Sequence, residues 1–99
     1  MTVEQAIELL KRLIATPSLS RDESAAADIV EAQMVSMGFK PQRKGNNVWA
    51  EAWKRDESKP TILLDAHIDT VRPNAQWVRD PFAPTVEGDR LYGLGSNTI

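Results

Sequence analysis

The chain has 99 residues and a mass of 11.0 kDa, which is enough for one small domain. Its 41% hydrophobic and 26% charged residues are typical of a soluble globular protein, and the absence of cysteine excludes disulfides and thiolate metal sites. The net charge of −2 provides no basic field for nucleic acid or an anionic membrane. The sequence has no apolar run of the roughly 18 residues that a membrane span needs, and its start is acidic where a signal peptide is basic. We therefore expect a cytoplasmic protein without nucleic-acid or membrane partners.

Two helices are predicted in the first part of the chain. The first opens on a capping box over residues 2–5 and ends near Thr16-Pro17, because proline disfavours a helical residue before it. The second opens on a similar capping box over residues 20–23 and ends at Gly38. The apolar stripe of this second helix consists of Ala26, Ile29, Val30, Met34 and Met37.

The remaining elements are predicted to be strands. Residues 48–53 alternate at strand spacing, which places Trp49 and Trp53 in the core, and Thr61–Leu64 is continuously apolar, as in a strand covered on both faces. Gly88-Asp89 suits a tight turn between two strands at 85–87 and 90–92. The pattern predicts an α/β fold with a mixed sheet and two long helices on one face.

The sole histidine, His67, follows the predicted apolar strand and has Asp65 and Asp69 two residues to either side. In open α/β sheets, ligand sites gather at the carboxyl ends of strands. Strand alternation would point all three side chains the same way, so an imidazole that binds a metal could donate its other N–H to a carboxylate. A His-x-Asp also occurs often by chance, and a lone histidine is more usually a hydrogen-bonded structural residue. Both interpretations stay open on these residues alone.

Other motifs carry weaker signals. Gly93-Leu94-Gly95 resembles the start of a phosphate-binding loop, but a turn is favoured because nothing downstream supplies the helix of such a loop. Trp77 and Phe82 are expected to cover a core from a long loop rather than to form a binding surface. Serines at positions 18, 20 and 96 offer hydroxyls, but the histidine is better placed to work with its aspartates, which argues against a serine triad.

Taken together, these motifs resemble the N-terminal part of the acetylornithine deacetylase, succinyl-diaminopimelate desuccinylase and aminoacylase family of metallopeptidases. The matching pieces are, in order, Ile62–Val71, Trp77, Asp80-Pro81-Phe82 and Leu91–Asn97. The two N-terminal helices fit as well, so the resemblance spans nearly the whole chain. It implies that residues 1–99 are the N-terminal portion of a three-layer α/β/α zinc-peptidase-like catalytic domain. The second, lid-like or dimerisation domain of the family would not be part of these residues.

The resemblance also implies a chemistry. His67 would bind one of two divalent metals, zinc or cobalt, and Asp69 would be the carboxylate that orients it. In the family, the metals polarise the amide carbonyl and activate a bridging water, whose proton passes to a downstream glutamate. The sequence looks most like the acetylornithine deacetylase branch, which implies hydrolysis of an N-acetyl amino acid such as N-acetylornithine in arginine biosynthesis. A desuccinylase or dipeptidase of the same family is the alternative.

Two departures from the family pattern limit this expectation. Thr98 stands where the family carries an aspartate that bridges both metals, and a neutral hydroxyl is a poor bridge between two cations. The chain then ends at Ile99, before the other ligands. We therefore expect a fragment that does not catalyse alone, although copies in a homo-oligomer could share a metal. In such a fragment the apolar strand Thr61–Leu64 would lack neighbours, which predicts association between chains or a fold that depends on partner chains. A different hypothesis is a non-catalytic α/β module whose interaction face is marked by Trp49, Trp53 and Trp77.

Overall fold

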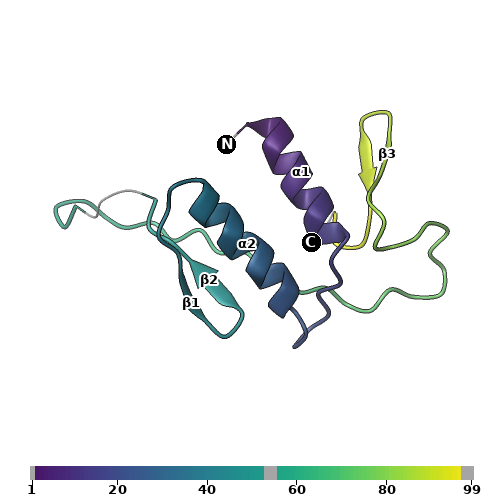
Figure 1. Ribbon diagram of the computed structural model, residues 1–99, viewed down its shortest axis with the longest axis horizontal. Helices are drawn as coiled ribbons and strands as arrows, with labels where there is room; N and C mark the ends of the chain where they lie inside the picture. The colour runs from purple at the N-terminus through teal and green to yellow at the C-terminus, as the bar shows by residue number, and fades with distance from the viewer. Residues whose placement is uncertain (1, 53–55, 97–99) are drawn as a thin grey trace.

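The computed structural model describes residues 2–52 and 56–96 (Figure 1). Its elements, in chain order, are α1 (Val3–Ile14), α2 (Ser24–Ser36), β1 (Gln42–Lys44), β2 (Asn47–Trp49), β3 (Thr85–Glu87) and β4 (Arg90–Tyr92). β1 pairs with β2 and β3 with β4, so the strands form two separate two-stranded antiparallel sheets. Helices and strands are thus combined as predicted. The mixed sheet with both helices on one face does not occur among the described residues, because the two hairpins do not pair with each other.

Helix α1 begins and ends where the sequence predicts. The Gln5 N–H donates to Thr2 Oγ1 at 3.1 Å, and the Thr2 N–H donates to Gln5 Oε1 at 2.8 Å, which completes the capping box. These bonds satisfy amides that lack a partner within the first turn. At the other end, Ile14 is buried, whereas Ile7 on the same helix is 42% exposed. Only the last turn of α1 therefore contributes substantially to the core.

The start of α2 differs from the prediction. The helix begins at Ser24, its N-cap residue is Glu23, and no side chain caps it. The Ser20 hydroxyl, expected to cap the helix, instead donates to the Asp69 carboxylate. A long-range contact has therefore replaced the local one.

The end of α2 agrees with the prediction. Gly38 has a φ of 89°, in the left-handed region that favours glycine. The N–H of Gly38 donates to the carbonyl of Val35, and that of Phe39 donates to the carbonyl of Met34, both at 3.0 Å. This pair of bonds is a Schellman motif, which ends the helix and turns the chain into the first hairpin.

The β3–β4 hairpin forms as predicted, with Val86 opposite Leu91 and Gly88 at a φ of 61°. The β1–β2 hairpin was not predicted, although its loop, Gly45-Asn46, is also a recognised hairpin signal. β2 stops at Trp49, so the strand predicted over residues 48–53 is confirmed only at its start, and Trp53 lies outside the described residues. Trp49 is 42% exposed and is not part of the core.

The apolar segment Thr61–Leu64 is not the buried strand that the sequence predicts. Its residues form neither helix nor strand, and the side chains of Ile62 and Leu63 are 82% exposed and that of Leu64 91%. A strand of this kind becomes buried only where neighbouring strands and covering helices pack against it. Among the described residues, the short hairpins are paired within themselves and supply no such neighbour.

The chain is loosely packed for its size. Its accessible surface is 8137 Å², against about 5,600 Å² for a compact monomer of this mass. Its radius of gyration is 15.3 Å, against about 13 Å for a compact chain of this length. Irregular segments project at both ends of the long axis, while α1 and α2 lie side by side between them (Figure 1). The described part of the chain has no helix that is both long and apolar enough to span a membrane.

Candidate functional site

Residues 65–70, which we call the histidine loop, are held by the segment that follows α1 through parallel backbone pairing. The Thr70 N–H donates to the Ser18 carbonyl at 2.7 Å, and the Ser20 N–H donates to the Thr70 carbonyl at 3.2 Å, which makes Leu19 the bridge partner of Thr70. The hydroxyl of Ser18, which is 5% exposed, donates to the Ile68 carbonyl at 2.8 Å. One short stretch of chain therefore fixes the backbone on which the candidate residues lie.

The predicted turn, at residues 93–96, forms a second side of the candidate site. The Ser96 N–H donates to the Gly93 carbonyl at 3.2 Å, and the Leu94 N–H donates to the Pro81 carbonyl at 2.8 Å. Gly95 has a φ of 82°, which a residue with a side chain rarely adopts. The prediction of a turn is confirmed, and the turn lies beside the histidine loop.

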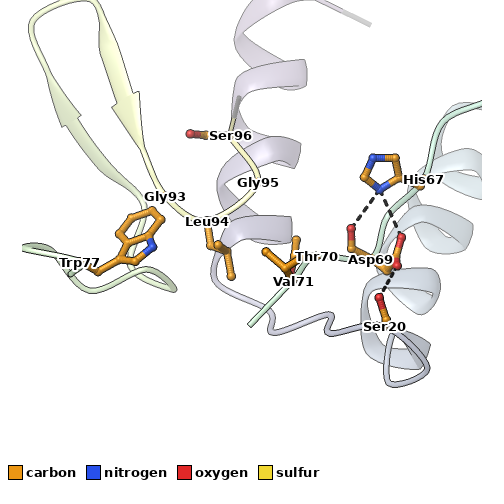
Figure 2. A pocket seen from close by; sticks show the side chains of 10 residues that line it. All are labelled: Ser20, His67, Asp69, Thr70, Val71, Trp77, Gly93, Leu94, Gly95 and Ser96. Carbon is orange, nitrogen blue, oxygen red and sulfur yellow. Dashed lines mark hydrogen bonds and ion pairs between the residues drawn. The ribbon is translucent and has the colours of Figure 1, made fainter. Parts of the chain in front are cut away.

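His67 and Asp69 are in contact, as the family resemblance implies (Figure 2). His67 Nδ1 lies 3.0 Å from the main-chain oxygen of Asp69 and 3.2 Å from Asp69 Oδ1. A carbonyl and an ionised carboxylate only accept hydrogen bonds, so this geometry places the hydrogen of the neutral ring on Nδ1. The lone pair is then on Nε2, which is the arrangement of a histidine whose free nitrogen binds a metal.

The Asp69 carboxylate is also held from its other side. Its Oδ2 accepts a hydrogen bond of 2.6 Å from the Ser20 hydroxyl. This bond is the main reason that the pKa of Asp69 is lowered; a backbone hydrogen bond and the nearby His67 add to the effect, and partial burial opposes it. Because its pKa lies below the ordinary value of an aspartate, Asp69 is ionised at neutral pH and accepts a hydrogen bond from the imidazole.

These side chains line one side of an open pocket of about 620 Å³. His67, Asp69 and Ser20 lie on one side, Trp77 on the opposite side, and the turn with Leu94 between them (Figure 2). Trp77 is half-buried and lines this pocket from its loop. A pocket of this size suits a small-molecule ligand.

Asp65 does not take part in the contact between His67 and Asp69. It lines an adjacent pocket with His67 and Asp69, but its exposed side chain makes no hydrogen bond within the described residues. Strand alternation, on which the expectation of a shared side depended, does not apply here, because these residues do not form a strand.

The described residues do not form a complete metal site. His67, with an outward Nε2 and a supporting carboxylate, fits the role of one ligand. Within residues 2–52 and 56–96, however, no group of three or more His, Cys, Asp or Glu residues is gathered to hold an ion. Zinc sites use three or four protein ligands, so the remaining ligands would have to come from elsewhere. Thr98, the position of the predicted departure, lies outside the described residues.

The tryptophans give little support to a separate interaction module. Trp49 is on β2, which packs against α2, whereas Trp77 lines the pocket beside His67. The third tryptophan of that hypothesis, Trp53, is outside the described residues. The two described tryptophans therefore do not form a common face.

Comparison with known proteins bears on the resemblance. No family model matches the chain. Curated proteins named succinyl-diaminopimelate desuccinylase do match it. The protein of Thiobacillus denitrificans is 34% identical over 96% of this chain. Those of Sphingopyxis alaskensis and Coxiella burnetii are 33% identical over 91% and 32% identical over 95% of it, respectively. Over nearly its whole length, the chain is therefore similar to members of the metallopeptidase family that its motifs resemble. It spans about a quarter of the length of these relatives, 24 to 26%.

The names of the relatives also bear on the branch within the metallopeptidase family. The sequence motifs favoured acetylornithine deacetylase, with a desuccinylase as the alternative. The three relatives above are all named as desuccinylases, so the comparison favours the alternative. The short His-Ile-Asp-Thr-Val and Gly-Leu-Gly-Ser-Asn motifs did not suffice to choose between branches.

Proposed function

We propose that the chain forms part of a metal-dependent amide hydrolase in which His67 binds a divalent metal through Nε2. The contact between His67 Nδ1 and Asp69 carries this proposal, since it turns the lone pair of the ring outward while a carboxylate supports the ring from behind. When bound, the metal would polarise a carbonyl group and lower the pKa of its water. Asp69 keeps the imidazole in the tautomer that can bind it.

The proposed substrate is an N-acylated amino acid, with succinyl-diaminopimelate favoured over N-acetylornithine. The names of the curated relatives support this choice, and the open pocket beside His67 is large enough for a small acyl amino acid. Residues 1–99 would then be the N-terminal portion of a three-layer α/β/α catalytic domain. In that domain, the apolar segment Thr61–Leu64 would be covered by elements that the described residues do not provide.

Metal binding can be tested on the chain itself. Added zinc is expected to move the ¹⁵N resonance of His67 Nε2 while Nδ1 keeps its hydrogen. Asp69→Asn should weaken zinc binding by about ten- to a hundredfold, the usual cost of losing such a partner. Asp65→Asn is the matched control and should leave the affinity unchanged. Equal zinc binding by the wild type and His67→Ala would contradict the proposal.

Hydrolysis requires the remaining ligands, so it is best tested in a chimaera. This chain would replace the matching segment of the Thiobacillus denitrificans relative, and release of succinate from succinyl-diaminopimelate would be measured. We expect little activity with Thr98 and a large gain with Thr98→Asp, which restores the carboxylate that the family pattern carries. Adding His67→Ala to Thr98→Asp should abolish that gain. A folded Thr98→Asp chimaera without activity would argue against the proposed function.

A further inference from the structure

We infer that Ser20 is a positioning residue for His67: its hydroxyl fixes the Asp69 carboxylate, which in turn fixes the imidazole. The inference rests on the proposed function, because it assigns Ser20 a role in presenting the proposed metal ligand. Ser20 belongs to the segment between α1 and α2, 49 residues before Asp69 in the chain.

The carboxylate uses its two oxygens for different partners (Figure 2). Oδ2 accepts from the Ser20 hydroxyl at 2.6 Å, and Oδ1 lies 3.2 Å from His67 Nδ1. A carboxylate held through only one oxygen can rotate about its side-chain bonds. With both oxygens engaged its plane is fixed, and Oδ1 remains directed at the ring. The bond to Ser20 has an ionised acceptor, which makes it stronger than a bond between neutral groups.

Ser20 is itself held in place by the backbone. Its N–H donates to the carbonyl of Thr70, the residue directly after Asp69. The chain then reverses: Arg21 has a φ of 71°, and the Asp22 N–H donates to the Leu19 carbonyl at 2.8 Å. The hydroxyl therefore starts from a defined position beside Asp69, and it makes this contact in place of the helix cap that its sequence pattern offers.

Ser18 provides an internal comparison. It lies in the same short segment and also donates its hydroxyl to the histidine loop, but to the main-chain carbonyl of Ile68. Ser18→Ala should therefore loosen the backbone without changing a contact of the Asp69 side chain. Ser20→Ala should do the reverse, which allows a positioning role to be separated from a structural one.

The tautomer of the metal-free ring is the first measurement. Long-range ¹H–¹⁵N correlation under alkaline conditions reports which nitrogen of His67 carries the hydrogen. The wild type, Ser20→Thr and Ser18→Ala should show the Nδ1–H form, and Ser20→Ala should show a mixture of both tautomers. Ser20→Cys, which is close in size but a weak donor, should show an intermediate proportion of the two tautomers. This variant keeps the test decisive if the alanine variant does not fold. An unchanged tautomer in Ser20→Ala and Ser20→Cys, or an equal change in Ser18→Ala, would overturn the inference.

Zinc affinity is the second measurement. Ser20→Ala should weaken zinc binding several-fold, and Ser20→Thr should restore it because the hydroxyl returns. Ser18→Ala, compared at equal folded fraction, should bind as the wild type does. If the wild type binds no zinc through His67, the proposed function fails, whereas the tautomer comparison independently decides whether Ser20 orients the ring. Equal zinc affinity of Ser20→Ala and the wild type would count against the positioning role.

Discussion

Gly93 lies so close to Ile14 that a methyl group on its Cα would overlap the isoleucine side chain. Ile14 is the buried residue at the end of α1, and Gly93 is the first residue of the turn beside the histidine loop. The φ of Gly93 is not in the left-handed region, so backbone conformation does not require glycine here. Glycine is needed because the two residues approach each other closely. The contact thus joins the helix to the wall of the candidate site.

Gly93→Ala is expected to lower the free energy of unfolding by about 1–3 kcal/mol, the usual cost of overpacking. The amide of Leu94, which donates to Pro81, should exchange faster in the same variant because the turn must move away. Urea denaturation and hydrogen exchange would measure the two effects. In an Ile14→Ala background the methyl group has room, so Gly93→Ala should cost clearly less there. Equal costs in both backgrounds would show that the contact is not the cause.

The second hairpin should respond to acid through Glu87. Arg79 donates a hydrogen bond to the Glu87 carboxylate, and its Cζ atom lies 4.0 Å from the centre of the Tyr92 ring. The charged hydrogen bond from Arg79 lowers the pKa of Glu87. A lowered pKa in the folded state means that the pair stabilises the hairpin above the ordinary pKa of glutamate. This stabilisation is lost as the pH falls through the lowered value. Because the pair is exposed, we expect a small effect on stability.

The measurement is an NMR titration of the Glu87 carboxyl group. Arg79→Gln should return the pKa of Glu87 towards its ordinary value. Arg90→Gln is the matched control, since Arg90 is the residue directly opposite Glu87 in the hairpin and its removal changes the net charge equally. A larger pKa change with Arg90→Gln than with Arg79→Gln would contradict the assignment.

The exposed apolar segment should make the chain associate with itself. Ile62, Leu63 and Leu64 are consecutive and almost fully exposed, and contiguous apolar surface of this kind favours association. Sedimentation velocity at increasing concentration should therefore show growing species. Leu64→Lys should suppress them, whereas Val78→Lys, at an isolated residue that is 96% exposed, should not. A monomer at all concentrations would show that the segment does not drive self-association.

The sequence predicted those features whose determinants lie within a few residues. The capping box at Thr2, the glycine that ends α2 and the hairpin turn at Gly88 are each decided by local hydrogen bonds and backbone conformation. The loop at Gly45-Asn46 carried the same kind of signal and could have been found. The contact between His67 and Asp69 was implied by the family resemblance, whereas the spacing alone fitted Asp65 equally well.

Features that depend on distant partners were not predictable in the same way. Ser20 has the pattern of a helix cap, and nothing nearby in the sequence indicates that Asp69 competes for its hydroxyl. The segment Thr61–Leu64 has the composition of a buried strand, but composition does not supply the neighbours that bury it. Its burial depends on other elements, which makes it a non-local property.

Ser18 should be important for stability although it does not touch the candidate ligand. Its buried hydroxyl donates to the Ile68 carbonyl, and Ser18→Ala would leave this carbonyl without its partner in a position that water reaches poorly. We expect the free energy of unfolding to fall by about 1–3 kcal/mol. Ser36 is a suitable control, because its hydroxyl also donates to a main-chain carbonyl, that of Gln33, but at an exposed helix end. Ser36→Ala should change stability by no more than about 0.5 kcal/mol. Urea denaturation of both variants would test the difference, and equal effects would mean that burial at Ser18 does not set the cost.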